Sequence, residues 1–288
     1  MEQILEMTDF VGLNERADLR PARAEGRVHF WHGGAIWIGR AQGRTGWHEH
    51  HALQIALALD GACRFRSDPA GNWLAGRGAI VRPHRRHEFE VSSATVAQLF
   101  VEPETLQGRT LIERIAEADI TPLPEPQRFE MATILLRAHQ EGASAESMVA
   151  AAKQAIAVLA GPVEPQSAVD SRIARAVDYI RANITAPLSL TKVAAAVALS
   201  PSRFRHLFVE QTGAAFRAYV LWLRLNLAVE VAMAGESWTH AAQAAGFADS
   251  AHMTRTFKRM IGMNPATLVR ATSPGALSPA PPMPWPSS

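Results

Sequence analysis

The stretch that decides the fold is Val193–Gly213, "VAAAVALSPSRFRHLFVEQTG", together with its second copy Ala241–Gly262, "AAQAAGFADSAHMTRTFKRMIG". In each copy an alanine-rich segment leads to a turn. An amphipathic segment then runs to a glycine, which ends many helices because it adopts positive φ freely. Two helices joined by a tight turn form a helix-turn-helix unit. The sequence therefore predicts two such units in its C-terminal half.

The two copies also agree in their apolar positions. Phe208 and Phe257 each lie five residues before the closing glycine, and Phe204 and Met253 lie four residues earlier, one turn back on the same face. We expect these four side chains to be buried. Ala198 stands where the second copy has Gly246, and a positive φ at that alanine would cost about 1 kcal/mol.

Charge separates the two halves of the chain. Residues 1–167 carry 17 Lys and Arg against 21 Asp and Glu, whereas residues 168–288 carry 12 against 6. A basic C-terminal half attached to an acidic N-terminal half indicates that the C-terminal half meets a polyanion such as DNA.

Residues 170–270 resemble the DNA-binding domain of the AraC/XylS family of transcription regulators. The residues that carry the resemblance are Gly213, Phe216, Tyr219, Arg224, Leu225, Ala228, Ala242, Gly246, Phe247 and the run Thr254–Pro265. Leu268 departs from the family, which usually has tyrosine there. The resemblance implies that the second helix of each unit enters the major groove, and that the two helices read groove segments about 34 Å apart.

The resemblance also assigns the DNA-facing residues, which are those left outward when the apolar positions face inward. They are Ser202, Arg203, Arg205 and His206 on the first helix, and Ser250, Ala251, Thr254, Arg255, Lys258 and Arg259 on the second. We expect Arg205 and Arg255 to read bases, because a guanidinium matches guanine O6 and N7 in two hydrogen bonds. Lys258 and Arg259 are expected nearer the phosphates. The alternative is that these side chains form an ordinary solvated surface.

The N-terminal half has a different texture. Between residues 28 and 101, short apolar or alternating runs separated by Gly, Pro and Asp predict a β-sandwich or barrel. Helical periodicity follows, including "ILLRAHQ" and "VAAAKQAIAVL", whose apolar stripes would either form a dimer contact or pack back onto the barrel. We therefore expect an α+β two-domain protein, with an N-terminal cupin-like β-barrel plus helices and a C-terminal all-α double helix-turn-helix.

The changes in sequence pattern along the chain predict where its domains begin and end. They are a sensing domain at 1–115, a helical dimerisation segment at 116–162, a linker at 163–169, a DNA-binding domain at 170–272 and a disordered proline-rich tail at 273–288.

A histidine cluster opens the apolar segment "WHEHHALQIALALDG" at Trp47–Gly61. Because residues two apart in a strand point the same way, His48, His50 and Gln54 would share one interior face, while His51 would point outward. The spacing resembles the first cupin motif, and Gly78–His87 resembles the second, which adds His87. Gln54 stands where the cupin motif has glutamate, and the glycine between Pro83 and His87 is absent.

Two readings of this cluster stay open. Three neutral imidazoles suit zinc, nickel, copper or iron, although the missing glutamate removes the anionic ligand and should weaken binding. Alternatively, the histidines line a metal-free pocket and hydrogen-bond a small polar ligand or one another. No cofactor is therefore certain, and a divalent transition metal is the one candidate.

We expect a sequence-specific DNA-binding regulator, an activator or a repressor, controlled by a small-molecule effector in the barrel. A transition-metal-responsive regulator is the alternative, and a cupin enzyme fused to a DNA-binding domain is a remote third. No G-x-S-x-G, P-loop or cysteine nucleophile with a partner occurs, so we predict no enzyme activity. The expected partners are double-stranded DNA, the effector, RNA polymerase if the protein activates, and a second copy in a homodimer. Without a signal peptide or an apolar span, a cytoplasmic protein is expected, with no membrane partner.

Overall fold

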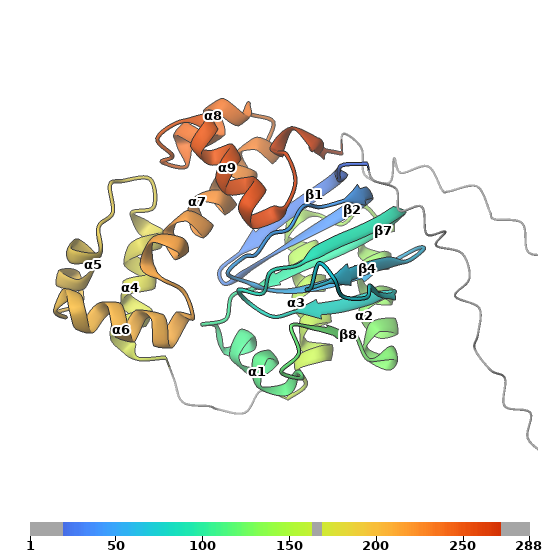
Figure 1. Cartoon of the computed structure of the whole chain (residues 1–288), viewed down its shortest axis with the longest axis horizontal. Coiled ribbons are helices and arrows are strands. Elements are labelled where there is room, and N and C mark those ends of the chain that lie inside the picture. Colours follow the sequence, from blue (N-terminus) through green and yellow to red (C-terminus); the bar gives the residue numbers. More distant parts are fainter. Residues whose placement is uncertain (1–19, 163–168, 272–288) are drawn as a thin grey trace, which may run out of the picture.

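The chain folds into a curved sheet with helices on one face and a separate group of helices beside it (Figure 1). The computed structural model describes residues 20–162 and 169–271. Of the expected divisions, the linker (apart from Val169) and the proline-rich tail at 273–288 lie outside the described residues. The expected α+β fold with an N-terminal sheet region and a C-terminal all-α region is confirmed.

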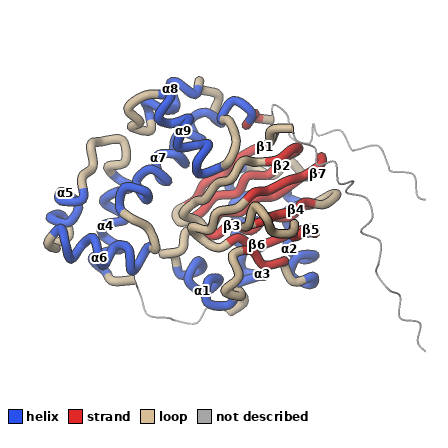
Figure 2. Tube along the Cα trace, viewed as in Figure 1, coloured by secondary structure: helices blue, strands red, loops and turns tan. Residues whose placement is uncertain are grey.

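Nine strands build the sheet, which appears red in Figure 2. They are β1 (Arg23–Trp31), β2 (Gly34–Arg44), β3 (Leu53–Ala58), β4 (Cys63–Arg66), β5 (Leu74–Gly76), β6 (Gly78–Val81), β7 (Glu88–Val101), β8 (Ile120–Pro122) and β9 (Leu268–Arg270). Their order is β8-β6-β3-β7-β2-β1-β9, with β4 joined to β7 and β5 to β4. Within the described chain this path has two ends, so the sheet does not close into the predicted barrel. The two edges that would pair in a closed barrel are instead formed by the short strands β8 and β9.

Three helices cover one face of the sheet: α1 (Leu106–Arg114), α2 (Glu125–Gln140) and α3 (Ala145–Ala160). Strand β3 is buried along its whole length, and alternate residues such as Ile55 pack against Met131 of α2 and Ile156 of α3. Ser144 caps α3 by accepting a hydrogen bond from the backbone N–H of Ser147. The apolar stripes of α2 and α3 therefore pack onto the sheet, which was one of the two expected uses for them.

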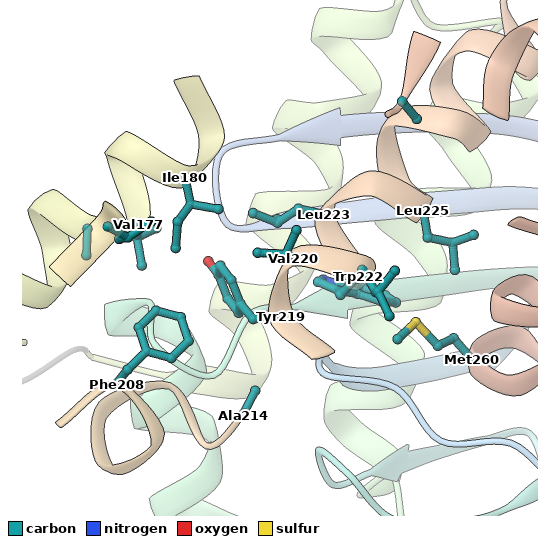
Figure 3. Packing of buried hydrophobic residues seen from close by; sticks show 14 of the residues in the cluster. Val177, Ile180, Phe208, Ala214, Tyr219, Val220, Trp222, Leu223, Leu225 and Met260 are labelled. Atoms are coloured by element: carbon teal, nitrogen blue, oxygen red, sulfur yellow. The ribbon is translucent and has the colours of Figure 1, made fainter. Parts of the chain in front are cut away.

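Six α-helices and a short 3₁₀ helix form the C-terminal region. They are α4 (Ser171–Ala182), α5 (Leu190–Ala196), α6 (Pro201–Thr212), α7 (Phe216–Met233), α8 (Trp238–Ala244), α9 (Ser250–Ile261) and η1 (Pro265–Thr267). Helix α7 runs through the middle of this region, and its Tyr219 and Leu225 are fully buried. Figure 3 shows Tyr219 beside Phe208 of α6, with ring centroids 5.3 Å apart.

The two regions are joined at several places besides the chain connection. Strand β9, which follows the last helix, pairs in parallel with β1 through Ala24–Gly26. Helix α7 also contacts β1, so the helical region lies against the sheet. No helix among the described residues is both long and apolar enough to cross a bilayer.

Candidate DNA-binding helices and effector cavity

The first helix-turn-helix unit consists of α5 and α6. Ser200 caps α6 by accepting from the N–H of Arg203, and Gly213 ends it with φ 74°. Phe204 and Phe208 are fully buried, as predicted. The predicted DNA-facing residues Ser202, Arg203, Arg205 and His206 are all exposed on the same helix. This leaves a basic outer surface on α6.

The second unit consists of α8 and α9 and is built in the same way. Asp249 caps α9 by accepting from the N–H of His252, and Gly262 ends it with φ 77°. Met253 and Phe257 are fully buried, as predicted. The remaining predicted residues divide into half-buried and exposed ones: Ser250 and Thr254 are half-buried, and Ala251, Arg255, Lys258 and Arg259 are exposed.

The turns of the two units share one backbone conformation. Ala198 has φ 55° and Gly246 has φ 75°. In both turns the following N–H bonds back to the helix, from Leu199 to the carbonyl of Ala194 and from Phe247 to the carbonyl of Ala242. The alanine therefore adopts the left-handed conformation that its alignment with Gly246 predicts.

The three histidines predicted for one interior face come together. His48, His50 and His87 are buried, and one ring nitrogen of each lies within 4.8 Å of the others. Their Nδ1 atoms lie 2.9, 2.8 and 2.9 Å from the carbonyl oxygens of Gly46, Ala52 and Arg85. A carbonyl only accepts, so each Nδ1 carries the ring proton and each Nε2 keeps its lone pair. Burial lowers the pKa of His48 to about 3 and also lowers the pKa of His50 and His87.

Gln54 lies against this cluster, as the strand alternation predicts. Its Oε1 is 2.9 Å from Nε2 of His50 and 3.0 Å from Nε2 of His87, and its Nε2 is 2.7 Å from Oε1 of Gln98. An oxygen facing two lone pairs makes no hydrogen bond. Either the amides of Gln54 and Gln98 are both turned by half a rotation, so that the NH₂ of Gln54 donates to both imidazoles and its oxygen accepts from Gln98, or a cation lies between these acceptors.

His51 turns away from the cluster of His48, His50 and His87 and contacts His84 instead, with the two ring nitrogens 3.3 Å apart, but it is not exposed as predicted. It is 3% exposed, and its Nε2 donates to Oε2 of Glu104 at 2.9 Å. Glu104 also accepts from the hydroxyl of Tyr219 at 2.6 Å, and the neighbouring Glu102 pairs with Arg181 of α4. Burial alone would raise the pKa of Glu104, but the hydrogen bonds from His51 and Tyr219 hold it below its ordinary value.

This buried polar cluster links the sheet to the helical region, and sequence reasoning missed it. Glu102 and Glu104 follow the last residue of β7, whereas Arg181 and Tyr219 are 79 and 115 residues further along the chain. Nothing near either segment signals the pairing. The one hint is that Glu102 and Glu104 directly follow a buried strand, where unpaired carboxylates are costly.

A mainly apolar cavity of about 130 Å³ lies between the sheet and the DNA-binding helices. The sheet side supplies His48, His50, Gln54, Gln98, Phe100 and Trp37, and the helical side supplies Trp222, Asn226, Val229, Phe257, Ile261 and Met263. The rings of His50 and Trp222 are 6.0 Å apart across it. The predicted effector residues therefore line a cavity whose other wall belongs to the DNA-binding region.

Helix α9 is docked directly on the loop that carries the histidines. The N–H of Gly46 donates to the carbonyl of Gly262 at 2.6 Å, and the N–H of Glu49 donates to the carbonyl of Arg259 at 3.2 Å. A Cβ atom at Gly262 would lie 2.5 Å from Nδ1 of His48. The end of α9 is therefore in contact with the loop that carries His48.

Comparisons with known proteins agree with this architecture. A family described as "Helix-turn-helix domain" matches residues 193–271. The crystal structure of ToxT from Vibrio cholerae O395 shares the fold over 85% of this chain and 94% of its own, with 10% identity and a TM-score of 0.51. A transcriptional regulator from Chromobacterium violaceum, described as containing an AraC-type DNA-binding domain, is 29% identical over 33% of this chain and 87% of its own, with a TM-score of 0.32. No curated protein matches the chain in sequence.

The helix-turn-helix match spans both units from within α5 onward and overlaps the segment whose residues resemble the AraC/XylS family. The ToxT fold extends the likeness to the N-terminal sheet. The chain thus carries a helix-turn-helix domain at residues 193–271, within a two-region fold that it shares with ToxT.

Proposed function

We propose that this regulator is controlled by a small-molecule effector that binds in the cavity between the sheet and helices α7 and α9. The observation that carries the proposal is the mixed lining, in which His50 and Phe100 of the sheet region face Trp222, Val229 and Phe257 of the DNA-binding region. A molecule held there contacts both regions at once.

The control would act on the docking of the two regions. An effector shifts an equilibrium between docked and released DNA-binding helices only by its differential affinity for the two states. Because half of the cavity wall leaves when the helices leave, the two states differ in what they offer the effector. Arg205 of α6 and Arg255 of α9 are proposed to read bases, and Lys258 and Arg259 to contact phosphates.

The test is to fill the cavity with a side chain. Val229 of α7 is 9% exposed and lines it, so Val229→Phe should push α7 away from the sheet. Val269→Phe is the matched control, because Val269 is 43% exposed and outside the cavity. With a duplex selected from a random pool, we expect Val229→Phe to change the Kd at least tenfold and Val269→Phe to leave it within twofold. Equal behaviour of the two variants would refute control through this cavity.

A transition-metal-responsive regulator is a second candidate, and one observation favours it. One ring nitrogen of each of His48, His50 and His87 lies within 4.8 Å of the others, and Oε1 of Gln54 faces Nε2 of His50 and of His87, so a cation would suit this group of acceptors. The residues fit zinc, nickel, copper or iron in donor type, without an anionic ligand. We expect one equivalent of metal in freshly purified protein, lost in His48→Ala/His50→Ala. Failure of the unchanged protein to bind any of these ions on titration would dismiss this candidate.

Further partners belong to the same proposal. We propose a homodimer formed through the outer side of α2, where Phe129 is 69% exposed while the inner stripe is covered by the sheet. Phe129→Glu should shift the sedimentation coefficient from that of a dimer to that of a monomer. RNA polymerase is proposed as a partner if the protein activates transcription, and we assign no catalytic role to the histidines.

A further inference from the structure

Two residues that line the cavity carry buried donors without acceptors. Nε1 of Trp37 and Nε1 of Trp222 have no hydrogen-bond partner, although the two side chains are 8% and 2% exposed. Ten buried side-chain atoms in the described residues lack a partner, and these two indole nitrogens are the ones that belong to cavity-lining residues. A buried donor left unpaired is costly, so such groups call for an acceptor from outside the chain.

Helix α7 presents a second polar group beside Trp222. Asn226 follows one turn later on the same face, it lines the cavity, and its amide makes no hydrogen bond to any described residue. Val229 continues this face with an apolar side chain. Helix α7 therefore carries two groups without a hydrogen-bond partner, Trp222 and Asn226, and the sheet opposite carries one, Trp37, beside aromatic rings such as Phe100.

The charge of the lining limits what can bind. Among the described lining residues the only charged side chain is that of Arg23, which is exposed. The imidazoles of His48 and His50 direct lone pairs toward the cluster rather than positive charge. A carboxylate or phosphate in the apolar interior would lack a cation, and burial of an unpaired charge is strongly unfavourable.

Size supplies the last limit. A dry apolar cavity of about 150 Å³ admits a single aromatic ring, and the space inside this partly open cavity, about 130 Å³, is comparable. We propose that the effector is an uncharged molecule of about one ring that carries a hydrogen-bond acceptor, held by the indole N–H of Trp222 and the amide of Asn226. This inference deepens the proposed function and rests on it.

Three probes of nearly equal size test the need for an acceptor and the exclusion of charge separately. Acetophenone is neutral and has an acceptor, cumene has the same shape without an acceptor, and benzoate has acceptors and a negative charge. With the full chain in a calorimetric titration, acetophenone should bind at least tenfold more tightly than cumene and benzoate. Tightest binding by benzoate would overturn the exclusion of charge, and equal binding of acetophenone and cumene would overturn the role of the donors.

Variants then assign the donor. Trp222→Phe should reduce the preference for acetophenone over cumene about fivefold, while the Kd for cumene stays within twofold and so shows that the cavity is intact. Asn226→Leu should reduce the same preference. Trp73→Phe is the matched control, because Trp73 packs against Arg64 and Arg66 away from the cavity, and it should change neither Kd. An unchanged preference in both α7 variants would refute the assignment.

The result is separable from the outcome for the proposed function. If no probe binds at millimolar concentration but Val229→Phe still changes DNA affinity, the ligand class is wrong and control through the cavity stands. If acetophenone binds as expected but Val229→Phe leaves DNA affinity unchanged, the cavity binds the ligand without controlling DNA binding.

Discussion

The two helix-turn-helix units have nearly the same interior and very different surroundings. Helices α6 and α9 both begin at a side-chain cap and end at a glycine with φ near 75°. Yet α9 is hydrogen-bonded through its last turn to the loop of His48, whereas a Cβ at Gly213, the end of α6, would come no closer than 3.9 Å to His84. The two copies of the repeat therefore share the caps and buried residues that each unit needs to fold. The hydrogen bonds to the loop of His48 come from the last turn of α9 and its closing glycine, and they are not part of what the copies share.

The largest effect should come from adding one methyl group at each closing glycine. Gly213→Ala and Gly262→Ala both force alanine into a left-handed conformation, which costs about 1 kcal/mol. At Gly262 the new Cβ would also meet Nδ1 of His48 at 2.5 Å and the carbonyl oxygen of Gly46 at 2.6 Å. We expect an additional loss of about 1–3 kcal/mol there. Urea unfolding measures both free energies, and equal losses would mean that the second unit is not held against the sensor.

The next largest effects should come from the two arginines proposed to read bases, and they test whether both units bind DNA. Arg205→Ala and Arg255→Ala should each weaken operator binding by about 1–3 kcal/mol and relax specificity at different positions of the site. Fluorescence anisotropy on single-base variants of the operator separates the two effects. Binding of both variants like the unchanged protein would refute the assignment of the reading helices.

Lower pH should weaken the docking of α9 on the loop of His48 before it weakens the packing of α6. The pKa of His48 is about 3 in the folded protein and near 6.5 when unfolded, so the unfolded chain binds more protons between these values. Stability is therefore complete above about pH 6.5 and falls as pH drops toward 3, by at most about 1.4 kcal/mol per pH unit for this histidine.

The measurement uses protein treated with a chelator, since a bound metal would compete with protons for the same nitrogen. Urea unfolding at pH 6 and pH 5 gives the change in the free energy of unfolding per pH unit, and His48→Asn should reduce this slope. Hydrogen exchange at pH 5 should show loss of protection in α9 before α6. A slope that is the same in the variant would exclude His48 as its source.

The smallest effect concerns the turns. Ala198 is exposed and has φ 55°, so Ala198→Gly should stabilise the protein by about 1 kcal/mol without loss of packing. The reverse change, Gly246→Ala, should destabilise by more than this, because its Cβ would lie 3.0 Å from the carbonyl oxygen of Thr185. Thermal unfolding measures the effect of both changes. If Ala198→Gly destabilises the protein, the backbone of Ala198 is not strained.

The sequence was informative where structure follows from local spacing. The offsets of Phe204 and Phe208 from Gly213 predicted the buried face of α6, and the alternation of His48, His50 and Gln54 predicted a shared interior face. His87 joined them because the second cupin-like segment forms the neighbouring part of the sheet. These features depend on residues close together in the chain or on motifs with fixed spacing.

Contacts between the two regions could not be predicted in this way. The pairing of β9 with β1 depends on only three residues, and Leu268 had been seen merely as a departure from a family pattern. His51 was expected to face solvent, but Tyr219 and Glu104 enclose it. Both outcomes depend on how the sheet region and the helical region pack against each other. The periodicity of one segment predicts which of its faces is buried, but it does not predict which distant segment covers that face.

Strand β9 and the chain connection after α3 hold the helical region at both of its ends. Release of β9 would therefore leave the DNA-binding helices tethered at millimolar effective concentration to the surface they left. Redocking is unimolecular, so dilution cannot drive the helices off, and each docking contact can be individually weak. The proposed effector then needs only modest affinity to set the balance between docked and released helices, and this intramolecular balance does not depend on the concentration of the protein.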